Sequence, residues 1–380
     1  MDFNLSKEHY LLREMYHKFA ENEVKPLAGE VDETEDAPME TIEKLSQYGM
    51  LGICYPKKYG GQGADYLSYV MCVEEISKVC GSTGVIISAH TSLCCEPIYE
   101  NGTEEQKMKY LPDLLSGKKL GAFGLTESDA GTDVSGQQTK AELEGDNYIL
   151  NGTKIFITNA GFAETFVVFA VTDKSKGRRG VSAFIVERGF PGFSVGKHEK
   201  KMGIRGSPTC ELIMENCIVP KENMLGKEGG GLSIALKTLD GGRIGIAAQA
   251  LGLAEGAIEE TIKYVQERKQ FGKRISQQQN TQFELADMYT KAAAAKYLVY
   301  AAAMAKSEKR PYAKDAAMAK LFASELSSDV TRRCVQLFGG YGYIRDYPVE
   351  RMMRDAKITE IYEGTSEAQK MVISAAIGVK

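Results

Sequence analysis

The chain has 380 residues, of which 43% are hydrophobic and 26% charged, a globular composition that excludes a disordered or collagen-like chain. Lys and Arg number 47 against 51 Asp and Glu, so the net charge of −4 offers no strong basic field for a nucleic acid or an anionic membrane. The polar, acidic start from Met1 to Ser6 is unlike a secretory signal, and no apolar run reaches the roughly 18 residues that a membrane helix needs.

Cysteine and histidine usage predicts a reducing compartment and no metal site. The eight cysteines include no Cys-x-x-Cys pair, and none of the four histidines lies at metal-ligand spacing from another. We therefore expect a cytoplasmic protein whose thiols pack as small apolar side chains. A catalytic Cys–His pair stays open as the alternative, with His90 and Cys94 as its local candidates.

The first 120 residues predict an N-terminal α-helical domain. Leu11, Met15 and Phe19 recur every four residues and form one apolar stripe of a helix. Residues 39–51 and 69–79 carry similar patterns. Glycine-rich stretches at 59–63 and 81–84 predict loops between the helices.

Residues 121–230 predict a small antiparallel β domain, because the hydrophobic period changes there. Asn151-Gly152 lies between two β-prone runs, 148–150 and 154–158, which predicts a two-residue hairpin. Residues 166–171 and 181–186 predict two more strands, and 188–192 predicts a turn. Strands and helices do not alternate, so a nicotinamide-binding Rossmann unit is not expected.

Residues 231–380 predict a C-terminal four-helix-bundle domain. Apolar residues recur at steps of three and four over 247–265, 285–302 and 319–337, and alanine-rich seams favour close packing of these helices. The predicted fold class is therefore α+β: an N-terminal helical domain (1–120), a central β domain (121–230) and a C-terminal bundle (231–380).

Three stretches could carry chemistry. Residues 121–133 and 336–343 are rich in glycine, which can bring backbone close to a ligand. Taken alone, the first stretch is more often a plain loop, and the glycines of the second can simply end a helix. In residues 355–367, Glu363 is followed at once by Gly364, so we expect this carboxylate to leave the regular helix. Thr365 and Ser366 then predict the start of the next helix. Read alone, Glu363 could also be a solvated loop acid or a cap.

Read together, six ordered motifs resemble the acyl-CoA dehydrogenase flavoenzymes over essentially the whole chain, closest to the short-chain, butyryl-CoA branch of anaerobic bacteria. The motifs are Leu125-Thr126-Glu127 with Ala130-Gly131-Thr132-Asp133, Gly152 to Asn159, Glu267 to Lys273, Gln336 to Gly340, Met353 to Lys357, and Ile361 to Glu367.

The resemblance implies an FAD-dependent enzyme that oxidises the α,β C–C bond of an acyl-CoA, or reduces an enoyl-CoA in reverse. It implies that Glu363 is the catalytic base and that electrons pass to an electron-transferring flavoprotein. It also implies a homotetramer in which Arg268, Phe271, Gln278 and Gln279 reach the FAD of a neighbouring subunit. No nucleic acid, membrane or metal is expected as a partner.

Further site residues follow from the same resemblance. Those implied to bind FAD are Phe123, Gly124, Leu125, Thr126, Glu127, Thr132, Phe156, Ile157, Thr158, Arg268, Phe271, Gln278, Gln279, Gln336, Leu337, Phe338, Gly339, Gly340, Thr365 and Glu367. Those implied to line the acyl-CoA are Thr132, Asp240, Arg243 and Gly364.

The chain departs from the family pattern at three places. Ser128-Asp129 stands where many relatives have proline, Phe156 stands where many have tryptophan, and Gly242 stands where some relatives carry the base. Because Gly242 has no side chain, Glu363 is the single candidate base. An acyl-CoA oxidase and a helical scaffold that has lost FAD stay open as alternatives. The acyl group (butyryl, branched or aryl-acrylyl), the physiological direction, and whether the partner flavoprotein bifurcates electrons also stay open.

Overall fold

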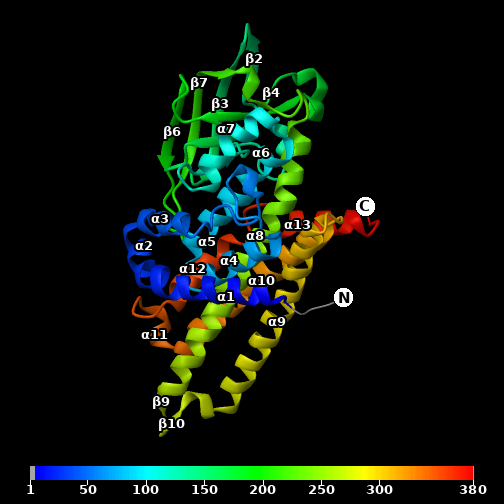
Figure 1. Cartoon of the computed structure of the whole chain (residues 1–380). Helices are drawn as coiled ribbons and strands as arrows, with labels where there is room; N and C mark the ends of the chain where they lie inside the picture. The colour runs from blue at the N-terminus through cyan, green and yellow to red at the C-terminus, as the bar shows by residue number, and fades with distance from the viewer. Residues whose placement is uncertain (1–4, 380) are drawn as a thin grey trace.

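The computed structural model describes residues 5–379, and the N-terminal third of this range is helical (Figure 1). The predicted stripe at 11–19 lies in α1, and those at 39–51 and 69–79 lie mostly in α3 and α4, which end at Gln47 and Ser77, so these helices are confirmed with shorter ends. The helices of this region are α1 (Lys7–Phe19), α2 (Ala28–Thr34), α3 (Met39–Gln47), α4 (Tyr66–Ser77), α5 (Gly81–Ser88), α6 (Glu96–Asn101) and α7 (Glu104–Leu115).

The loop predicted at residues 81–84 is wrong, because these residues form the first turn of α5. A Cβ atom built on Gly84 would overlap Ser77 Oγ, and one on Gly81 would lie 3.0 Å from Asp355 Oδ2. The glycines therefore allow close packing between helices and do not mark a turn.

The central region is one eight-stranded sheet with the strand order β6-β7-β3-β2-β4-β5-β8, and β1 pairs with β4. Most pairs are antiparallel, as predicted, whereas β1–β4 and β2–β4 are parallel. The predicted strands at 166–171 and 181–186 are confirmed. The strands are β1 (Gly121–Gly124), β2 (Lys140–Glu144), β3 (Asn147–Thr158), β4 (Thr165–Val171), β5 (Val181–Glu187), β6 (Phe193–His198), β7 (Thr209–Pro220) and β8 (Met224–Leu225).

The hairpin predicted at Asn151-Gly152 is also wrong. Both residues lie inside β3, where the pairing with β7 shifts between Leu150 and Gly152. A Cβ atom on Gly152 would overlap Thr139 Oγ1, so this glycine serves a bulge where two backbones approach closely. The real turn is at Gly145 and Asp146, between β2 and β3.

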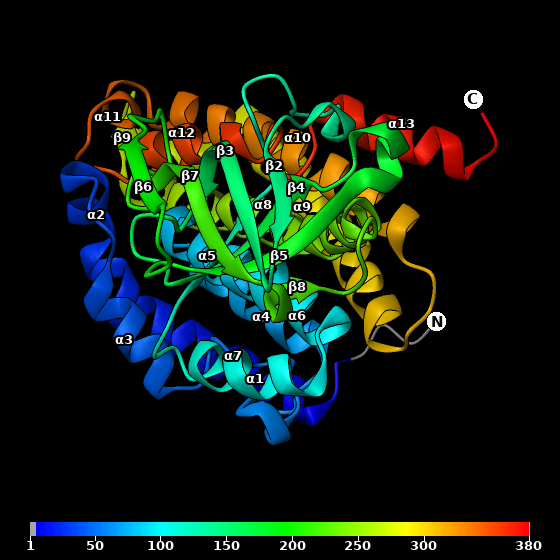
Figure 2. The same ribbon diagram turned by 90° about the horizontal axis from the view of Figure 1, so that it is seen from above.

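The C-terminal region is built on three long helices, which confirms the three that the sequence predicts. Alanines of α8 and α10 are completely buried and let these helices pack closely. Figure 1 shows the sheet at one end of α8 and the small β9–β10 ribbon at the other, and Figure 2 shows the sheet from above, with β6, β7, β3, β2 and β4 in this order. The elements are α8 (Gly231–Glu267), β9 (Lys269–Gln270), β10 (Lys273–Arg274), α9 (Gln279–Ser307), α10 (Ala313–Phe338), α11 (Gly340–Tyr343), α12 (Val349–Ile358) and α13 (Ser366–Ala376).

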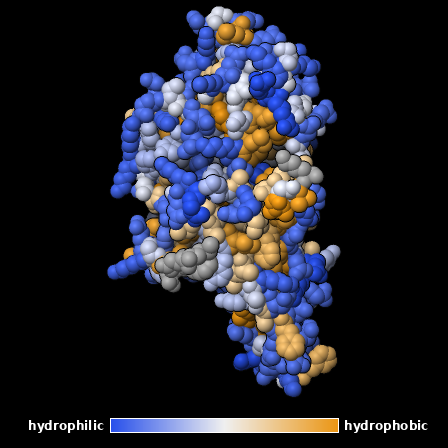
Figure 3. All heavy atoms as spheres, turned by 90° about the vertical axis from the view of Figure 1, so that its right-hand side faces the viewer, coloured by the Kyte–Doolittle hydropathy of each residue, from blue (hydrophilic) through white to orange (hydrophobic). Residues whose placement is uncertain are grey.

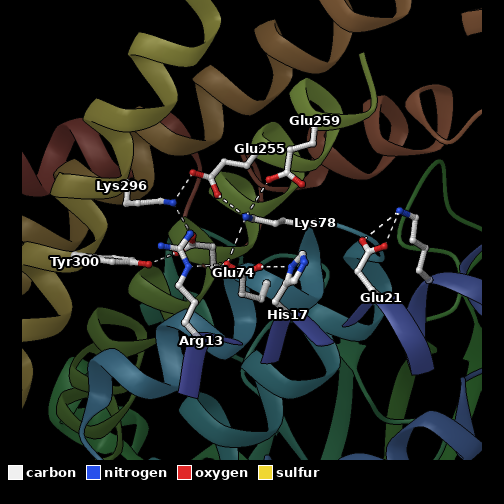
Figure 4. A network of polar contacts seen from close by, with 11 residues as sticks. Arg13, His17, Glu21, Glu74, Lys78, Glu255, Glu259, Lys296 and Tyr300 are labelled. Atoms are coloured by element: carbon white, nitrogen blue, oxygen red, sulfur yellow. Dashed lines mark hydrogen bonds and ion pairs between the residues drawn. The ribbon is translucent and has the colours of Figure 1, made fainter. Parts of the chain in front are cut away.

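A buried ionic network joins the N-terminal helices to the C-terminal ones (Figure 4). Glu74 of α4 has no exposed surface and lies 3.0 Å from Lys296 of α9, while Tyr300 donates to it at 2.8 Å. Lys78, the residue after α4, pairs with Glu255 of α8 at 3.2 Å. Because a buried charge that loses its partner typically costs about 3–5 kcal/mol, this network holds α4 against α8 and α9.

Residues 5–379 contain neither a candidate membrane span nor a candidate metal cluster. No helix in this range combines the length and the hydropathy needed to cross a bilayer. No group of three or more His, Cys, Asp or Glu side chains in the same range is placed to hold a metal ion.

Candidate active site

Glu363 lies in the short connection between α12 and α13, as the sequence predicts. Its φ of 52° and that of Gly364, 96°, are both left-handed, so the chain reverses sharply there. Thr365 then caps α13 by accepting a hydrogen bond from the Ala368 N–H. Lys320 of α10 donates to the Gly364 carbonyl oxygen at 2.7 Å and thereby ties the connection to α10. The base candidate is therefore fixed by its own backbone.

The carboxylate of Glu363 points at α8. A Cβ atom on Gly242 would overlap Glu363 Oε2 and would lie 2.9 Å from Leu93 Cδ2, so only glycine leaves room for this carboxylate. Oε2 is buried and has no hydrogen-bond partner among the described residues. Burial raises the pKa of Glu363 to about 8, against the opposing charges of Lys320 and Arg243.

Two buried cations lie near this carboxylate without pairing with it in residues 5–379. Arg243, 6% exposed, donates from Nη1 to Asp240 at 2.5 Å, whereas its Nε has no partner. Lys320 is fully buried, and burial lowers its pKa to about 8. Glu363 therefore stays available as a proton acceptor, and Arg243 keeps one buried donor free.

The loop after β1 is fastened to the sheet by a buried ion pair. Lys154 of β3 lies 2.6 Å from Glu127, which also accepts from the backbone N–H groups of Gln138 and Thr139. Lys154 also donates to the Gln137 side chain at 2.9 Å. The carboxylate of Glu127, a predicted FAD residue, is thus committed to its own chain and shapes the loop.

The end of β3 presents an apolar ring between hydroxyl groups. Phe156 is 61% exposed with a left-handed φ of 59°. Ile155 N–H donates to the Thr126 carbonyl oxygen at 2.9 Å and brings the two segments together. The hydroxyls of Thr126 and Thr158 form no hydrogen bond within residues 5–379. An exposed ring beside unpaired hydroxyls fits the planar, polar-edged flavin ring that the resemblance implies.

The other predicted FAD residues of this region differ in how far they are exposed to solvent. Ile157 is buried in the sheet core, and Phe123 packs edge-on against Phe169 with ring centroids 5.0 Å apart. Thr132 and Glu367 are exposed. Gly124 and Leu125 are buried, so they could offer a ligand only their backbone.

The remaining predicted FAD residues lie at the far end of α8, a region that we call the tip: residues 268–279 with 336–340. Arg268, Gln336 and Leu337 line an open hollow there with Gly339 and Gly340. Phe271 is 95% exposed, and its φ of 51° is left-handed. Gln278 and Gln279 are exposed as well. Phe338 is buried and stacked on Tyr264, so only its backbone could contact a ligand.

The structure does not bring the tip and Glu363 together within one chain. Gly242 and Arg268 lie 26 residues apart on or just beyond α8, which is roughly 39 Å at the helical rise. Figure 1 shows the same separation, with β9 and β10 at the end of α8 opposite the sheet. One bound molecule cannot use both sets of residues of the same chain.

The alternative Cys–His pair is excluded as a catalytic site. His90 is buried between the Gly121 N–H at 3.1 Å and the Leu114 carbonyl oxygen at 3.1 Å, so both ring nitrogens are used. Burial lowers the pKa of His90 to about 4 and raises that of the Cys94 thiol to about 12. His90 and Cys94 are therefore uncharged side chains that pack in the protein interior.

Sequence reasoning missed the positioning role of Lys320 and of Gln369, whose amide donates to the Gly364 carbonyl oxygen at 2.8 Å. A signal for Lys320 exists in the sequence. It is the one charge within the apolar stripe formed by Ala316, Ala319 and Ala323. A lone cation in such a stripe has to find a partner inside the protein.

Comparisons with known proteins agree with this geometry. Three family models match the chain: acyl-CoA dehydrogenase, N-terminal domain (residues 6–118), middle domain (122–217) and C-terminal domain (229–378). A short-chain specific acyl-CoA dehydrogenase of Clostridium acetobutylicum is 63% identical over 99% of this chain and 100% of its own length. A caffeyl-CoA reductase–Etf complex subunit of Acetobacterium woodii is 49% identical over 97% of this chain and 98% of its own.

Solved structures are equally similar. Butyryl-CoA dehydrogenase from Megasphaera elsdenii superposes with a TM-score of 0.98 at 51% identity, covering 99% of this chain and 100% of its own. A chain from the structure of an electron transferring flavoprotein of Acidaminococcus fermentans, described in terms of flavin-based electron bifurcation, gives a TM-score of 0.99 at 56% identity, with full coverage of both chains.

Proposed function

Because this chain belongs to the acyl-CoA dehydrogenase family, whose members are FAD-dependent oxidoreductases acting on the CH–CH group of an acyl-CoA, we propose that its own substrate is a short-chain acyl-CoA and that Glu363 is its base. The observation that carries the assignment of the base is the buried, unpartnered Glu363 Oε2 facing Gly242. The substrate class is supported by the short-chain relative at 63% identity and by the likeness to butyryl-CoA dehydrogenase.

Glu363 removes the proton from the α-carbon of the thioester. A carboxylate in an apolar pocket is a stronger base than one in water, which the raised pKa of about 8 expresses. The Glu363 backbone N–H donates to no backbone acceptor in residues 5–379. It can donate to the thioester carbonyl oxygen, where negative charge develops as the proton leaves.

FAD supplies the acceptor for the hydride that leaves the β-carbon. Phe156 gives the flavin ring an apolar face, and Thr126 and Thr158 give its edge two hydroxyls. Arg243 keeps its buried Nε for the substrate side of the site, and Asp240 holds its guanidinium in place. Thr132 and Gly364 complete the proposed contacts to the acyl-CoA. Thr365 and Glu367 complete the proposed contacts to FAD.

The tip residues Arg268, Phe271, Gln278 and Gln279 bind FAD across a subunit boundary in a homotetramer. Their distance from Glu363 in their own chain supports this, since only a second copy can bring them to the same FAD. Apolar side chains of α9 and α13 are also exposed, namely Phe283, Tyr289 and Met371. Figure 3 shows hydrophobic side chains gathered on the face that lies to the right in Figure 1, where α9 and α13 lie. Such a patch suits an interface between copies.

Further parts of the proposal concern partners and context. Electrons pass to an electron-transferring flavoprotein, as the descriptions of two relatives suggest. The enzyme works in the cytoplasm, where its eight free cysteines stay reduced. Its domains divide near residues 120 and 230, where β1 and α8 are about to begin.

Anaerobic titration of the purified holoprotein with a panel of acyl-CoAs tests the function. We expect flavin absorbance to bleach with butyryl-CoA at a lower concentration than with branched, long-chain or phenylpropionyl thioesters. Preference for an aryl thioester would contradict the substrate class. Rapid peroxide formation in air would identify an acyl-CoA oxidase. A colourless protein that takes up no FAD would favour the alternative of a non-catalytic helical scaffold.

A further inference from the structure

The connection between β4 and β5 concentrates positive charge in a short segment. Four cations, Lys174, Lys176, Arg178 and Arg179, lie exposed within a seven-residue 3₁₀ segment, Lys174–Gly180. Only Lys176 has an ion-pair partner among the described residues, Asp173 at 2.8 Å. In a chain with a net charge of −4, this segment is a local basic site.

The basic segment lies beside the first turn of α8. A Cβ atom on Gly229, just before α8, would overlap the Arg179 carbonyl oxygen. The Gly229 N–H donates at 2.9 Å to Ser182, the second residue of β5. Hydrogen bonds from Ser135 are the main cause that lowers the pKa of Asp133, and the charge of Arg178 adds to it, so Arg178 lies within electrostatic range of the residue that follows Thr132. Figure 1 shows this connection above the start of α8, on the same side as α13.

The burial of α8 decides where an elongated ligand can lie. Ser233, Leu236 and Lys237, in the first two turns, are exposed, whereas every residue from Gly241 to Ala254 is buried. A ligand whose reacting end meets Glu363 can therefore extend along α8 only toward its N-terminus. Gly231 and Gly242 are separated by roughly 17 Å at the helical rise, a span that a pantetheine arm can cover.

We propose that Lys174, Arg178 and Arg179 bind the phosphate groups at the nucleotide end of coenzyme A. This inference rests on the proposed function, which places an acyl-CoA thioester at Glu363. Coenzyme A carries its phosphates at the end remote from the thioester, and guanidinium groups match phosphate oxygens in geometry and charge. The basic segment thus recognises the coenzyme A part of the substrate through its phosphates, and the pocket around Glu363 recognises the acyl group.

The test compares a charge-neutralised enzyme with a matched control on three thioesters. R178Q/R179Q removes two cations of the basic segment. K197Q/K200Q removes two exposed cations in and just after β6, an edge strand separated from β4 by β7, β3 and β2. The substrates are butyryl-CoA, butyryl-3′-dephospho-CoA and butyryl-pantetheine, which lacks the nucleotide and all its phosphates. Each KM and kcat is measured with an artificial electron acceptor and again with an electron-transferring flavoprotein.

We expect R178Q/R179Q to raise KM for butyryl-CoA about three- to tenfold at low ionic strength, with kcat unchanged, and the effect to shrink in about 0.5 M salt. The rise should be smaller for the dephospho thioester and absent for butyryl-pantetheine. K197Q/K200Q should behave as wild type on all three.

Three results would overturn the inference. An equal rise on all three thioesters would mean that the variant disturbs the fold. No rise on any would mean that the cations do not meet the substrate. A rise confined to KM for the protein acceptor would make the segment a docking surface for an acidic protein. Failure of wild type to oxidise any of the thioesters would instead refute the proposed function.

Discussion

The pocket around Glu363 and the tip at the other end of α8 are opposites in how their groups are held. In the pocket, Glu363, Arg243 and Lys320 come from three separate segments, and their charged groups are withdrawn from water. At the tip, Phe271 is almost wholly exposed and the glutamines project into solvent. The groups that we propose for proton transfer are therefore assembled within one chain. The groups of the tip are exposed, and we propose that they meet the FAD of a neighbouring subunit.

This difference separates two kinds of evidence for a functional residue. A buried group without a partner, such as Glu363 Oε2, points to a ligand because its isolation costs free energy. An exposed aromatic side chain on strained backbone, such as Phe271, points to a partner surface. Its ring is 95% exposed, so packing within its own chain does little to offset the cost of the left-handed φ. The predictions below test each kind.

The largest expected effect is on Glu363. Glu363→Gln keeps the shape of the side chain but removes its basicity, so flavin reduction by butyryl-CoA should slow by roughly 10²–10⁴-fold. FAD content and assembly should stay as in wild type, because the pocket does not form the tip. Stopped-flow absorbance checks the rate. Near wild-type reduction would place the base elsewhere.

Gly242→Glu provides the companion experiment. The single variant should fold poorly or bind no substrate, because its Cβ overlaps Glu363 Oε2. Combined with Glu363→Gly, the new carboxylate gains that space, and part of the rate lost by Glu363→Gln should return. A double variant that folds, keeps FAD and is as slow as Glu363→Gln would show that the α8 position cannot reach the substrate.

The pH dependence of flavin reduction should follow the same carboxylate. Glu363 is protonated below its pKa of about 8, so the rate should rise nearly tenfold per pH unit up to that value and then level. Because the folded pKa is raised, the stability that this group contributes is present below its unfolded pKa and is lost as pH rises through about 8. Glu363→Gln should flatten both profiles, measured by rapid reduction and by thermal melting. A flat wild-type rate between pH 6 and 8 would contradict the raised pKa.

At the tip, Arg268→Ala should weaken FAD binding about tenfold or more, as expected for loss of a charge-assisted contact. The fold of each subunit should persist, because the Arg268 guanidinium lies over the exposed Tyr341 ring and forms no ion pair within residues 5–379. Its backbone hydrogen bonds to Tyr264 and Ile275 do not need the side chain. Equilibrium release of FAD from the purified tetramer measures the effect. Arg332→Ala removes an exposed cation of α10 and is the control. Equal FAD affinity in both variants would remove Arg268 from the site.

Arg243→Ala should give the smallest change, a roughly tenfold weaker binding of acyl-CoA with FAD retained. It also leaves the partly buried Asp240 without its cation, which lowers stability. Arg243→Ala/Asp240→Asn should restore the melting temperature without restoring the affinity, as measured by calorimetry with a substrate analogue. Recovery of both would make Arg243 a structural residue.

The sequence predicted what depends on local periodicity. The long helices followed from apolar steps of three and four residues, and the position of Glu363 followed from the helix break at Gly364. Where a glycine serves a neighbour distant in the chain, the same reasoning failed. Gly81, Gly84 and Gly152 were predicted as turns, but they accommodate side chains that only the tertiary structure brings close.

The residues of the candidate site also fall into those that the sequence predicted and those that only the tertiary structure shows. The motifs of the family resemblance predicted Glu363, the loop around Thr126 and the tip. The pairing of Glu127 with Lys154 and the support from Lys320 were not predicted, because each joins segments that the sequence keeps far apart. The proposed contact of the tip joins two copies of the chain, so it has no signal in the periodicity of a single sequence.

The left-handed backbone of Phe156, Phe271 and Glu363 has a consequence for engineering. Each side chain at such a φ costs folding free energy of order 1 kcal/mol, which glycine would recover. A selection for heat resistance alone will therefore enrich glycine at these three positions and discard the side chains proposed to face the flavin, to reach the neighbouring subunit and to move the proton. Directed evolution of this enzyme has to screen turnover in every round, or hold these codons fixed.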